Sequence, residues 1–265
     1  MSTTTALTTT PDKRTSRSAM PRGLRGLLVS ESRLMLRNPA LIAWVAAIPV
    51  IASIVLGALP ATREPRAGLD GSSWFTVYQP ILIMFSAVLL SVQILPDVLT
   101  RYREMGILKR LRTTPASPSA LLAAQVILAV VVEVVVAAVM VFVPAAFGAP
   151  LPRNMTGFVI AFAFSTGAML AIGMVLASAF RSNKVAGAVG TVLFFALQFF
   201  AGLWIPRATM PGWLRGISDA TPTGAAVGSL TDAVDGAWPQ LLHLGVLAAW
   251  MVVLAAVAVR IFRWE

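Results

Sequence analysis

Apolar and polar residues follow one another along this chain in long blocks, not in short alternating runs. Six stretches of at least 21 residues contain almost only apolar residues. A helix rises about 1.5 Å per residue, so about 20 apolar residues cross the hydrocarbon core of a bilayer. The pattern therefore predicts six transmembrane helices, over Pro39–Leu59, Phe75–Pro96, Ser119–Val143, Thr156–Phe180, Val185–Ile205 and Trp238–Val259.

The composition agrees with this reading of the pattern. Hydrophobic residues make up 57% of the chain and charged residues 12%, whereas about a quarter of a soluble domain is charged. Because backbone groups in lipid must be hydrogen-bonded within each segment, the stretches predict helices. Barrel strands would appear as shorter segments of alternating polarity. The expected fold class is therefore an all-α integral membrane protein.

Lys and Arg residues are distributed unevenly between the segments that flank the apolar stretches. Of the 21, 16 lie in the N-terminal segment, in residues 97–118 and 181–184, and at the C-terminus. Since basic residues mark the cytoplasmic side, both termini are expected in the cytoplasm. The net charge of +10 does not indicate a nucleic-acid-binding protein, because the basic residues are spread between apolar stretches.

Residues 1–21 are rich in Ser and Thr and contain no apolar core of a signal peptide. We expect them to form a disordered cytoplasmic tail, followed by one membrane domain over residues 22–265. The absence of cysteine excludes disulfides and Cys-ligated metal sites.

Residues 21–38, before the first stretch, predict an amphipathic helix lying in the cytoplasmic membrane interface. Glu31 interrupts its apolar face and is expected to have a protein partner. The alternative is an ordinary basic segment beside the membrane. On a helical wheel, the apolar face consists of Leu24, Leu27, Leu28, Leu34 and Met35, opposite Arg22, Arg33 and Arg37.

Residues 97–118, between the second and third stretches, are charged but patterned. Gly106 permits a sharp bend, and Pro115 ends a helix. Between them, apolar residues alternate with basic ones at helical spacing. This predicts a short cytoplasmic helix that can transmit a push from a soluble partner, and the alternative is a solvated positive loop. Its apolar face consists of Ile107, Leu108 and Leu111, and its basic face of Lys109, Arg110 and Arg112.

Residues 206–237, on the outer side, mix apolar and polar residues with several prolines and glycines. We expect short re-entrant helices between spans five and six, because irregular backbone at membrane depth must be buried in protein or face water. The residues that mark this outer segment are Gly202, Pro206, Pro211, Trp213 and Pro222.

Several polar residues lie inside the predicted spans. Glu133 is either a substrate site in a translocation pathway or a carboxyl group that holds neighbouring helices together. Gln93, Gln125 and Gln198 are candidates for the pathway or for hydrogen bonds between helices. His243 is the single histidine, and with no acidic neighbour on its helix face it is a poor metal or catalytic candidate.

Small residues in the fourth and fifth stretches, including Gly173 and Gly190, predict close helix packing within one chain, and the alternative is a seam between the two chains of a dimer.

Two motifs resemble the ABC-2 type permease family. Residues 103–115 read REMGILKRLRTTP, similar to the R-E-x-G-T-L-x-x-L-x-x-T-P pattern of its daunorubicin-resistance branch. Residues 200–206 (FAGLWIP), 210–214 (MPGWL) and 221–223 (TPT) resemble the family's last inter-span segment. The chain departs at Ile107, where the family commonly has Thr, and at Tyr102, which replaces the first acidic residue of an E-R-E triplet.

The resemblance implies a permease of the bacterial plasma membrane that exports an amphipathic drug or antibiotic, lipid or glycan. Two permease chains, identical or related, would pair, and two copies of a separate ATP-binding subunit would bind ATP and Mg. The chain has no G-x-x-x-x-G-K-[ST] phosphate loop, so we expect no cofactor and no enzymatic activity on it. The residues that the resemblance implies for ATPase coupling are Glu31, Arg101, Arg103, Glu104, Gly106, Leu108, Arg110 and Leu111.

Two other function classes fit less well. An ATP-independent secondary transporter usually carries charges or broken helices near the midplane of repeated halves, and this chain has one intramembrane charge and no visible repeat. An integral membrane enzyme needs a constellation of nucleophile, base or metal ligands, which the sequence does not show. ATP-driven export is therefore the favoured prediction.

Overall fold

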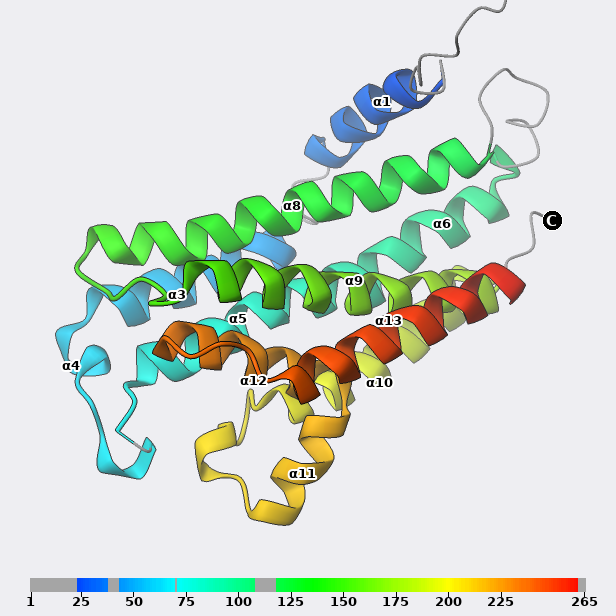
Figure 1. Ribbon diagram of the computed structural model, residues 1–265. Helices are drawn as coiled ribbons and strands as arrows, with labels where there is room; N and C mark the ends of the chain where they lie inside the picture. Colours follow the sequence, from blue (N-terminus) through cyan, green and yellow to red (C-terminus); the bar gives the residue numbers. More distant parts are fainter. Residues whose placement is uncertain (1–22, 38–42, 70, 108–117, 262–265) are drawn as a thin grey trace, which may run out of the picture.

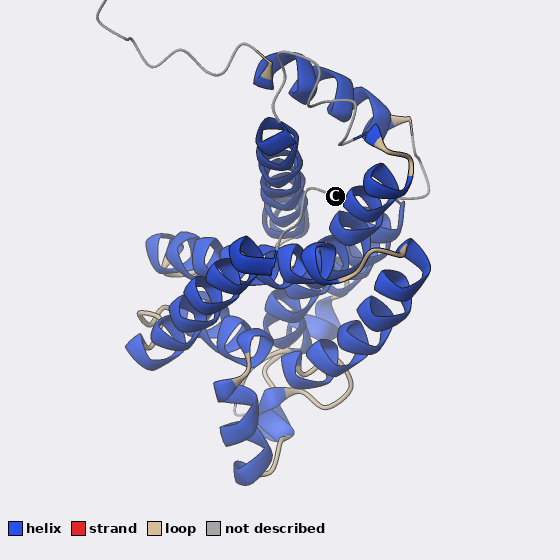
Figure 2. Cartoon of the chain, turned by 90° about the vertical axis from the view of Figure 1, so that its right-hand side faces the viewer, coloured by secondary structure: helices blue, strands red, loops and turns tan. Residues whose placement is uncertain are grey.

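The computed structural model describes residues 23–37, 43–69, 71–107 and 118–261 (Figure 1). Every regular element in these residues is a helix (Figure 2), which confirms the all-α fold class. The expected tail over residues 1–21 and the loop-helix residues Leu108, Arg110 and Leu111 lie outside the described residues.

Within the described residues, five helices are long and apolar enough to cross a membrane. The first predicted span corresponds to a shorter apolar helix, Trp44–Ala58, next to residues 38–42, which lie outside the described part. The count of six therefore stays a prediction. The five are a continuous helix of α5 (Trp74–Leu89), η3 (Leu90–Ile94) and α6 (Leu95–Glu104), then α8 (Pro118–Ala146), α9 (Met155–Ala179), α10 (Asn183–Ala201) and α13 (Leu241–Ile261).

The remaining elements are short. The Trp44–Ala58 helix combines the π-helical turn η1 (Ala43–Ala47) with α3 (Ile48–Ala58). Before it lies α1 (Leu24–Leu36), and after it come α4 (Pro60–Arg63) and η2 (Ala67–Leu69). Between α10 and α13 lie η4 (Arg207–Thr209), α11 (Gly212–Ala220) and α12 (Pro222–Asp235).

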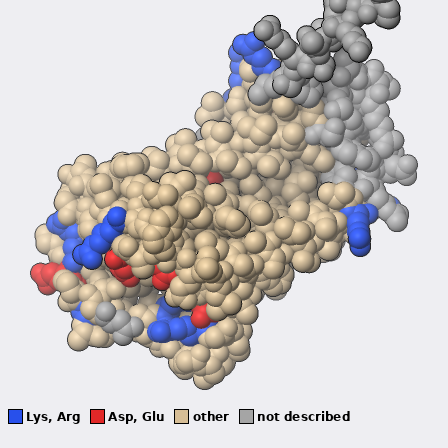
Figure 3. All heavy atoms as spheres, viewed as in Figure 1, with Lys and Arg blue, Asp and Glu red and all other residues tan. Residues whose placement is uncertain are grey.

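The charged residues lie mainly towards two ends of the bundle, with a nearly uncharged band between them on the face shown in Figure 3. We call the end that carries α1 and the end of α6 the α1 end, and the opposite one, with α4 and α11, the α11 end (Figure 1). An apolar band between two polar ends is the surface that a bilayer requires.

The π-helical turn η3 widens the second predicted span. It ends two residues before Pro96, just as η1 ends two residues before Pro49. Proline has no N–H and crowds the carbonyl of the preceding turn, and a wide turn relieves this conflict without breaking the helix. A Cβ on Gly173 would collide with the carbonyl oxygen of Ser91, and one on Gly190 with that of Val92. The prediction that these glycines pack within one chain is therefore confirmed.

A third proline lies where three helices meet. Pro144 lies inside α8 and cannot donate to the carbonyl of Met140. That carbonyl instead accepts hydrogen bonds from Ser53 Oγ and Gln79 Nε2, both at 3.2 Å. Because these donors come from α3 and α5, the proline makes α8 a junction for the first two apolar helices.

The hydrophobic core lies where α5, α8, α9, α12 and α13 meet, and α12 is its most enclosed short helix. Pro222 begins α12, while the Thr221 hydroxyl accepts the N–H of Gly224 at 3.1 Å. Eleven of its residues are buried. The short helices predicted between spans five and six are thus present, and their depth in the outer leaflet stays a prediction. The largest buried core side chains include Ile83, Met84, Met140, Met169, Leu230 and Leu247.

The residues predicted to mark this outer segment serve as helix boundaries. Gly202 ends α10 with φ of +92°, a left-handed conformation that favours glycine. Pro206 precedes η4, and Pro211 precedes α11. Trp213 in α11 is 70% exposed, as suits an aromatic ring at a membrane interface.

Candidate functional site

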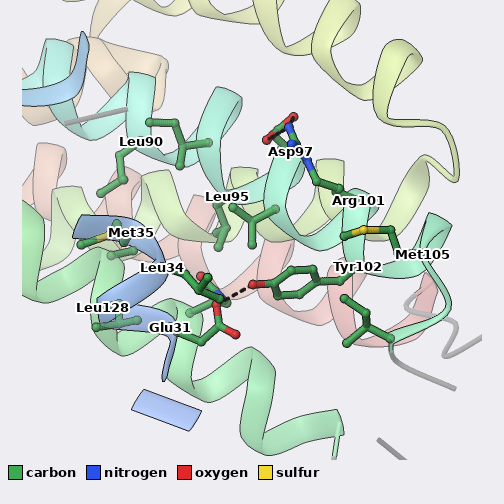
Figure 4. Close-up of a pocket in the computed structure, with 15 residues that line it drawn as sticks. Glu31, Leu34, Met35, Leu90, Leu95, Asp97, Arg101, Tyr102, Met105 and Leu128 are labelled. Carbon is green, nitrogen blue, oxygen red and sulfur yellow. Dashed lines mark hydrogen bonds and ion pairs between the residues drawn. The ribbon is translucent and has the colours of Figure 1, made fainter. Parts of the chain in front are cut away.

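The candidate functional site is the α1 end, where α1, α6, α8 and the α9–α10 turn meet. A cavity of about 400 Å³, here called the α1 cavity, opens between α1, η3–α6 and α8 (Figure 4). Its wall is mainly apolar, with some polar and charged residues. The polar and charged lining residues are Glu31, Asp97, Arg101, Tyr102 and Gln125, and the apolar ones include Leu34, Met35, Leu90, Ile94, Leu95 and Leu128.

Glu31 ties α1 to the two helices that complete the cavity. Its Oε2 accepts hydrogen bonds from Tyr102 Oη at 2.7 Å and from Gln125 Nε2 at 2.6 Å. The side chain is 8% exposed. The expected protein partners of Glu31 thus include two residues of this chain, and its contact with an ATPase stays a prediction.

The first half of the apolar face of α1 packs against protein. Leu24, Ala120 and Ala124 form a small buried cluster, joined by Leu27 and Leu28. The apolar stripe that the sequence assigned to lipid therefore contacts α8 over these leucines. Placement of α1 in the membrane interface stays a prediction.

Arg103 and Glu104 hold the turn between α9 and α10. Arg103 Nη1 donates to the carbonyl oxygens of Ala177 and Phe180, at 3.1 and 2.9 Å. Glu104 Oε1 accepts the backbone N–H of Asn183, at 2.7 Å. A cation thus lies at the C-terminus of α9 and an anion at the N-terminus of α10, the signs that helix dipoles favour.

The same face of α6 carries a second contact to α10. Asp97 forms an ion pair with Arg101 one turn away, at 2.8 Å, and accepts Asn183 Nδ2 at 2.9 Å. Arg101 remains 56% exposed. Gly106 follows α6 with φ of +68°, a left-handed conformation that favours glycine, and the bend into the loop helix stays a prediction.

The polar residues predicted inside the spans make contacts between helices. Glu133 is fully buried, and both of its oxygens accept Ser86 Oγ, at 3.0 and 3.2 Å. Gln93 Nε2 donates to Thr191 Oγ1 at 3.0 Å. Gln198 is buried, with no hydrogen-bond partner for its amide among the described residues. Glu133, Gln93 and Gln198 do not line the α1 cavity, and a place on a pathway stays a prediction for them.

A polar cluster at the α11 end was not predicted from the sequence. It lies in a second cavity, of about 320 Å³. His243, 4% exposed, has Nε2 3.3 Å from Asp219 Oδ1 and Nδ1 3.9 Å from Asp232 Oδ2. Arg207 pairs with Asp219 and donates to Ser218 Oγ at 2.8 Å. The acidic neighbours of His243 come from α11 and α12, so no pattern on its own helix could reveal them.

Asp235 lines the same cavity. Burial raises the pKa of its carboxyl, the positive charge of Arg153 opposes this shift, and the negative charge of Asp232 adds to it. Among the described residues, no group of three or more His, Cys, Asp or Glu side chains is arranged to hold a metal ion.

Comparison with known proteins shows the family to which the chain belongs. Residues 23–234 match the family model described as ABC-2 type transporter. The daunorubicin resistance ABC transporter permease protein DrrB1 of Streptomyces coeruleorubidus is 29% identical over 167 residues, which cover 60% of this chain and 58% of that protein. The inner membrane transport permease YhhJ of Escherichia coli is 26% identical over 171 residues, covering 61% of this chain and 46% of that one.

The chain thus spans about half the length of the relatives that it matches. The family match runs from α1, through the α6 segment that carries Arg103 and Glu104, to the end of α12. This membrane-embedded helical chain therefore belongs to the ABC-2 type transporter family.

Proposed function

We propose that the chain is the transmembrane permease subunit of an ATP-driven exporter in the bacterial plasma membrane. In this proposal it has six spans with both termini in the cytoplasm, and it moves an amphipathic substrate outward. A separate ATP-binding subunit, in two copies, hydrolyses ATP with Mg, and a second permease chain, identical or related, completes the pathway.

Family membership supports the transporter class, and one observation carries the mechanism. The adjacent residues Arg103 and Glu104, at the end of α6, contact the last carbonyls of α9 and the first N–H of α10. A displacement of α6 therefore reaches two long apolar helices through direct hydrogen bonds. A coupling segment for a soluble ATPase needs such a mechanical link to the membrane helices.

The link extends to α1 and along the second span. The hydrogen bond between Glu31 and Tyr102 joins α1 to α6. At its other end α6 continues through η3 into α5. A π-helical turn inside a long helix is a place where the helix can change its winding, so η3 is the hinge about which we expect α6 to move.

The surface left for the ATPase follows from these internal contacts. The carboxylate of Glu104 and the guanidinium of Arg103 are engaged inside the chain, whereas Arg101 is 56% exposed and Met105 is 52% exposed. We infer that Arg101 and Met105 contribute to the docking surface, and that Arg103 and Glu104 pass the motion on.

The test is co-expression with the ABC ATPase encoded nearest to this gene. We expect the two proteins to purify together and ATP hydrolysis to drive uptake of a fluorescent amphipathic dye into inverted vesicles. Transport driven by a proton gradient, with no ATPase bound and no ATP required, would instead establish the secondary-transporter alternative.

A further inference from the structure

The α1 cavity has the size and lining of a binding site for a small amphipathic molecule. Its volume of about 400 Å³ falls within the usual range of small-molecule pockets, which is roughly 300–1,000 Å³. Its wall is apolar along η3, α6, α8 and the second half of α1, and three of its polar residues, Glu31, Tyr102 and Gln125, are joined by hydrogen bonds. A ligand that fits this wall has an apolar body and one polar end.

Among the polar groups of the cavity, the carboxylate of Glu31 has one oxygen that can still accept a hydrogen bond. Tyr102 and Gln125 both donate to Oε2 of Glu31, and no described residue donates to Oε1. Figure 4 shows the Tyr102 ring pointing towards Glu31 across the cavity. Glu31 is 8% exposed, and its Oε1 accepts no hydrogen bond from the described residues. Leaving a buried carboxylate oxygen unpaired is costly, and a positively charged donor reduces that cost.

The described protein does not supply this donor. No Lys, Arg or His side chain of the described residues forms an ion pair with Glu31. Arg101 also lines the cavity, but its guanidinium is paired with Asp97 on its own helix at 2.8 Å. Among the described residues, therefore, no cation pairs with the carboxylate of Glu31.

We propose that the α1 cavity binds an amphipathic amine, with its apolar body against the leucine and methionine wall and its protonated nitrogen donating to Glu31 Oε1. A neutral amphiphile would leave this oxygen unpaired, and an anionic one would be repelled by it. Leu34 at the cavity is 55% exposed, so an apolar surface continues outward along α1.

The binding of an amine in this cavity does not depend on the proposed function. The further statement that this amine is the exported substrate does depend on it. The same chemistry has two sources, a free lipophilic amine or the headgroup of an ethanolamine phospholipid. Both present an ammonium group on an apolar body.

The test is a binding measurement on the full chain in nanodiscs of phosphatidylcholine and phosphatidylglycerol, which contain no primary amine. The probe is a fluorescent medium-chain alkylamine, and its N-acetylated form is the uncharged control. Glu31→Gln keeps the size and one acceptor oxygen but removes the charge. Glu64→Gln, at an exposed carboxylate outside the cavity, is the matched control.

We expect Glu31→Gln to weaken amine binding by about tenfold or more, the usual effect of losing a charge-assisted hydrogen bond. The N-acetyl probe should bind equally to both proteins, and Glu64→Gln should bind the amine as the wild type does. Equal amine affinity of Glu31→Gln and wild type, or an equal loss for both probes, would overturn the proposal.

A second variant covers the case in which Glu31→Gln fails to accumulate. Met35→Trp fills the cavity from α1 without changing Glu31 and should weaken binding of the amine, so unchanged amine binding would overturn the proposal. Adding phosphatidylethanolamine to the nanodiscs separates the two sources. If phosphatidylethanolamine competes with the probe, the occupant is the lipid. If it does not compete, the occupant is the free amine. Neither arm contains an ATPase, so failure here is distinct from failure of the proposed function.

Discussion

Glu104, the last residue of α6, accepts the backbone N–H of Asn183, the first residue of α10, at 2.7 Å. Ser182 occupies the N-cap position of α10 but makes no side-chain hydrogen bond there. A carboxylate 79 residues earlier in the chain thus takes the place of a local cap. The contact joins the second predicted span to the fifth.

Replacing Glu104 with alanine should loosen the start of α10 without unfolding the chain. Loss of a capping acceptor costs about 1 kcal/mol, which is about a fivefold rise in local opening. Hydrogen exchange by mass spectrometry should show this rise in a peptide that contains Asn183 and begins several residues before it. Glu64→Ala, at an exposed carboxylate, should leave exchange there unchanged. Equal protection in Glu104→Ala and wild type would contradict the capping role.

Three glycines offer a matched test of the packing around η3. An alanine at Gly173 or Gly190 meets a backbone carbonyl of η3, whereas a Cβ at Gly187 has nothing within 4 Å. Overpacking costs about 1–3 kcal/mol, so both Gly173→Ala and Gly190→Ala should lower the thermal unfolding temperature. Gly187→Ala should keep or slightly raise it, because alanine favours helix. An equal response of all three variants would show that the glycines do not serve close packing.

Glu133 and Ser86 form a pair suited to a double-mutant cycle. Since Ser86 Oγ donates to both oxygens of Glu133, Ser86→Ala and Glu133→Gln should each destabilise the fold, and their effects should be non-additive by about 1 kcal/mol. Both variants should retain transport if the carboxyl holds α5 against α8. Loss of transport in Glu133→Gln alone, at unchanged stability, would place Glu133 on the translocation pathway instead.

Orientation in the membrane can be measured directly, because the chain has no cysteine. Lys184 lies beside the α9–α10 turn, and Trp213 is 70% exposed at the α11 end. In intact cells, an impermeant thiol reagent should label Trp213→Cys and leave Lys184→Cys unlabelled until the membrane is opened. The reverse pattern would place the termini outside.

The sequence alone predicts the elements of this fold better than their contacts. The long apolar stretches correspond closely to α8, α9, α10 and α13, because about 20 apolar residues in lipid have few alternatives to a helix. The π-helical turns that end just before Pro49 and Pro96 were not predicted.

The contacts at the candidate site depend on residues far apart in the chain. Glu31 lies 71 residues from Tyr102 and 94 from Gln125, and no periodicity relates such positions. The sequence indicated only that Glu31 breaks an apolar face and needs a partner. For Arg103 and Glu104, the coupling role that the motif implied stays a prediction, and their positions at two helix ends follow only from the packing of α6 against the α9–α10 turn.

The central claim is that α6 transmits the motion of an ATPase to α9 and α10. Its most direct test compares the amount of substrate transported for each ATP hydrolysed in vesicles that contain this chain and its ATPase. Glu104→Ala should keep ATPase association and hydrolysis but transport several-fold less substrate per ATP, whereas Glu64→Ala should match the wild type. Unchanged transport per ATP in Glu104→Ala would contradict the account.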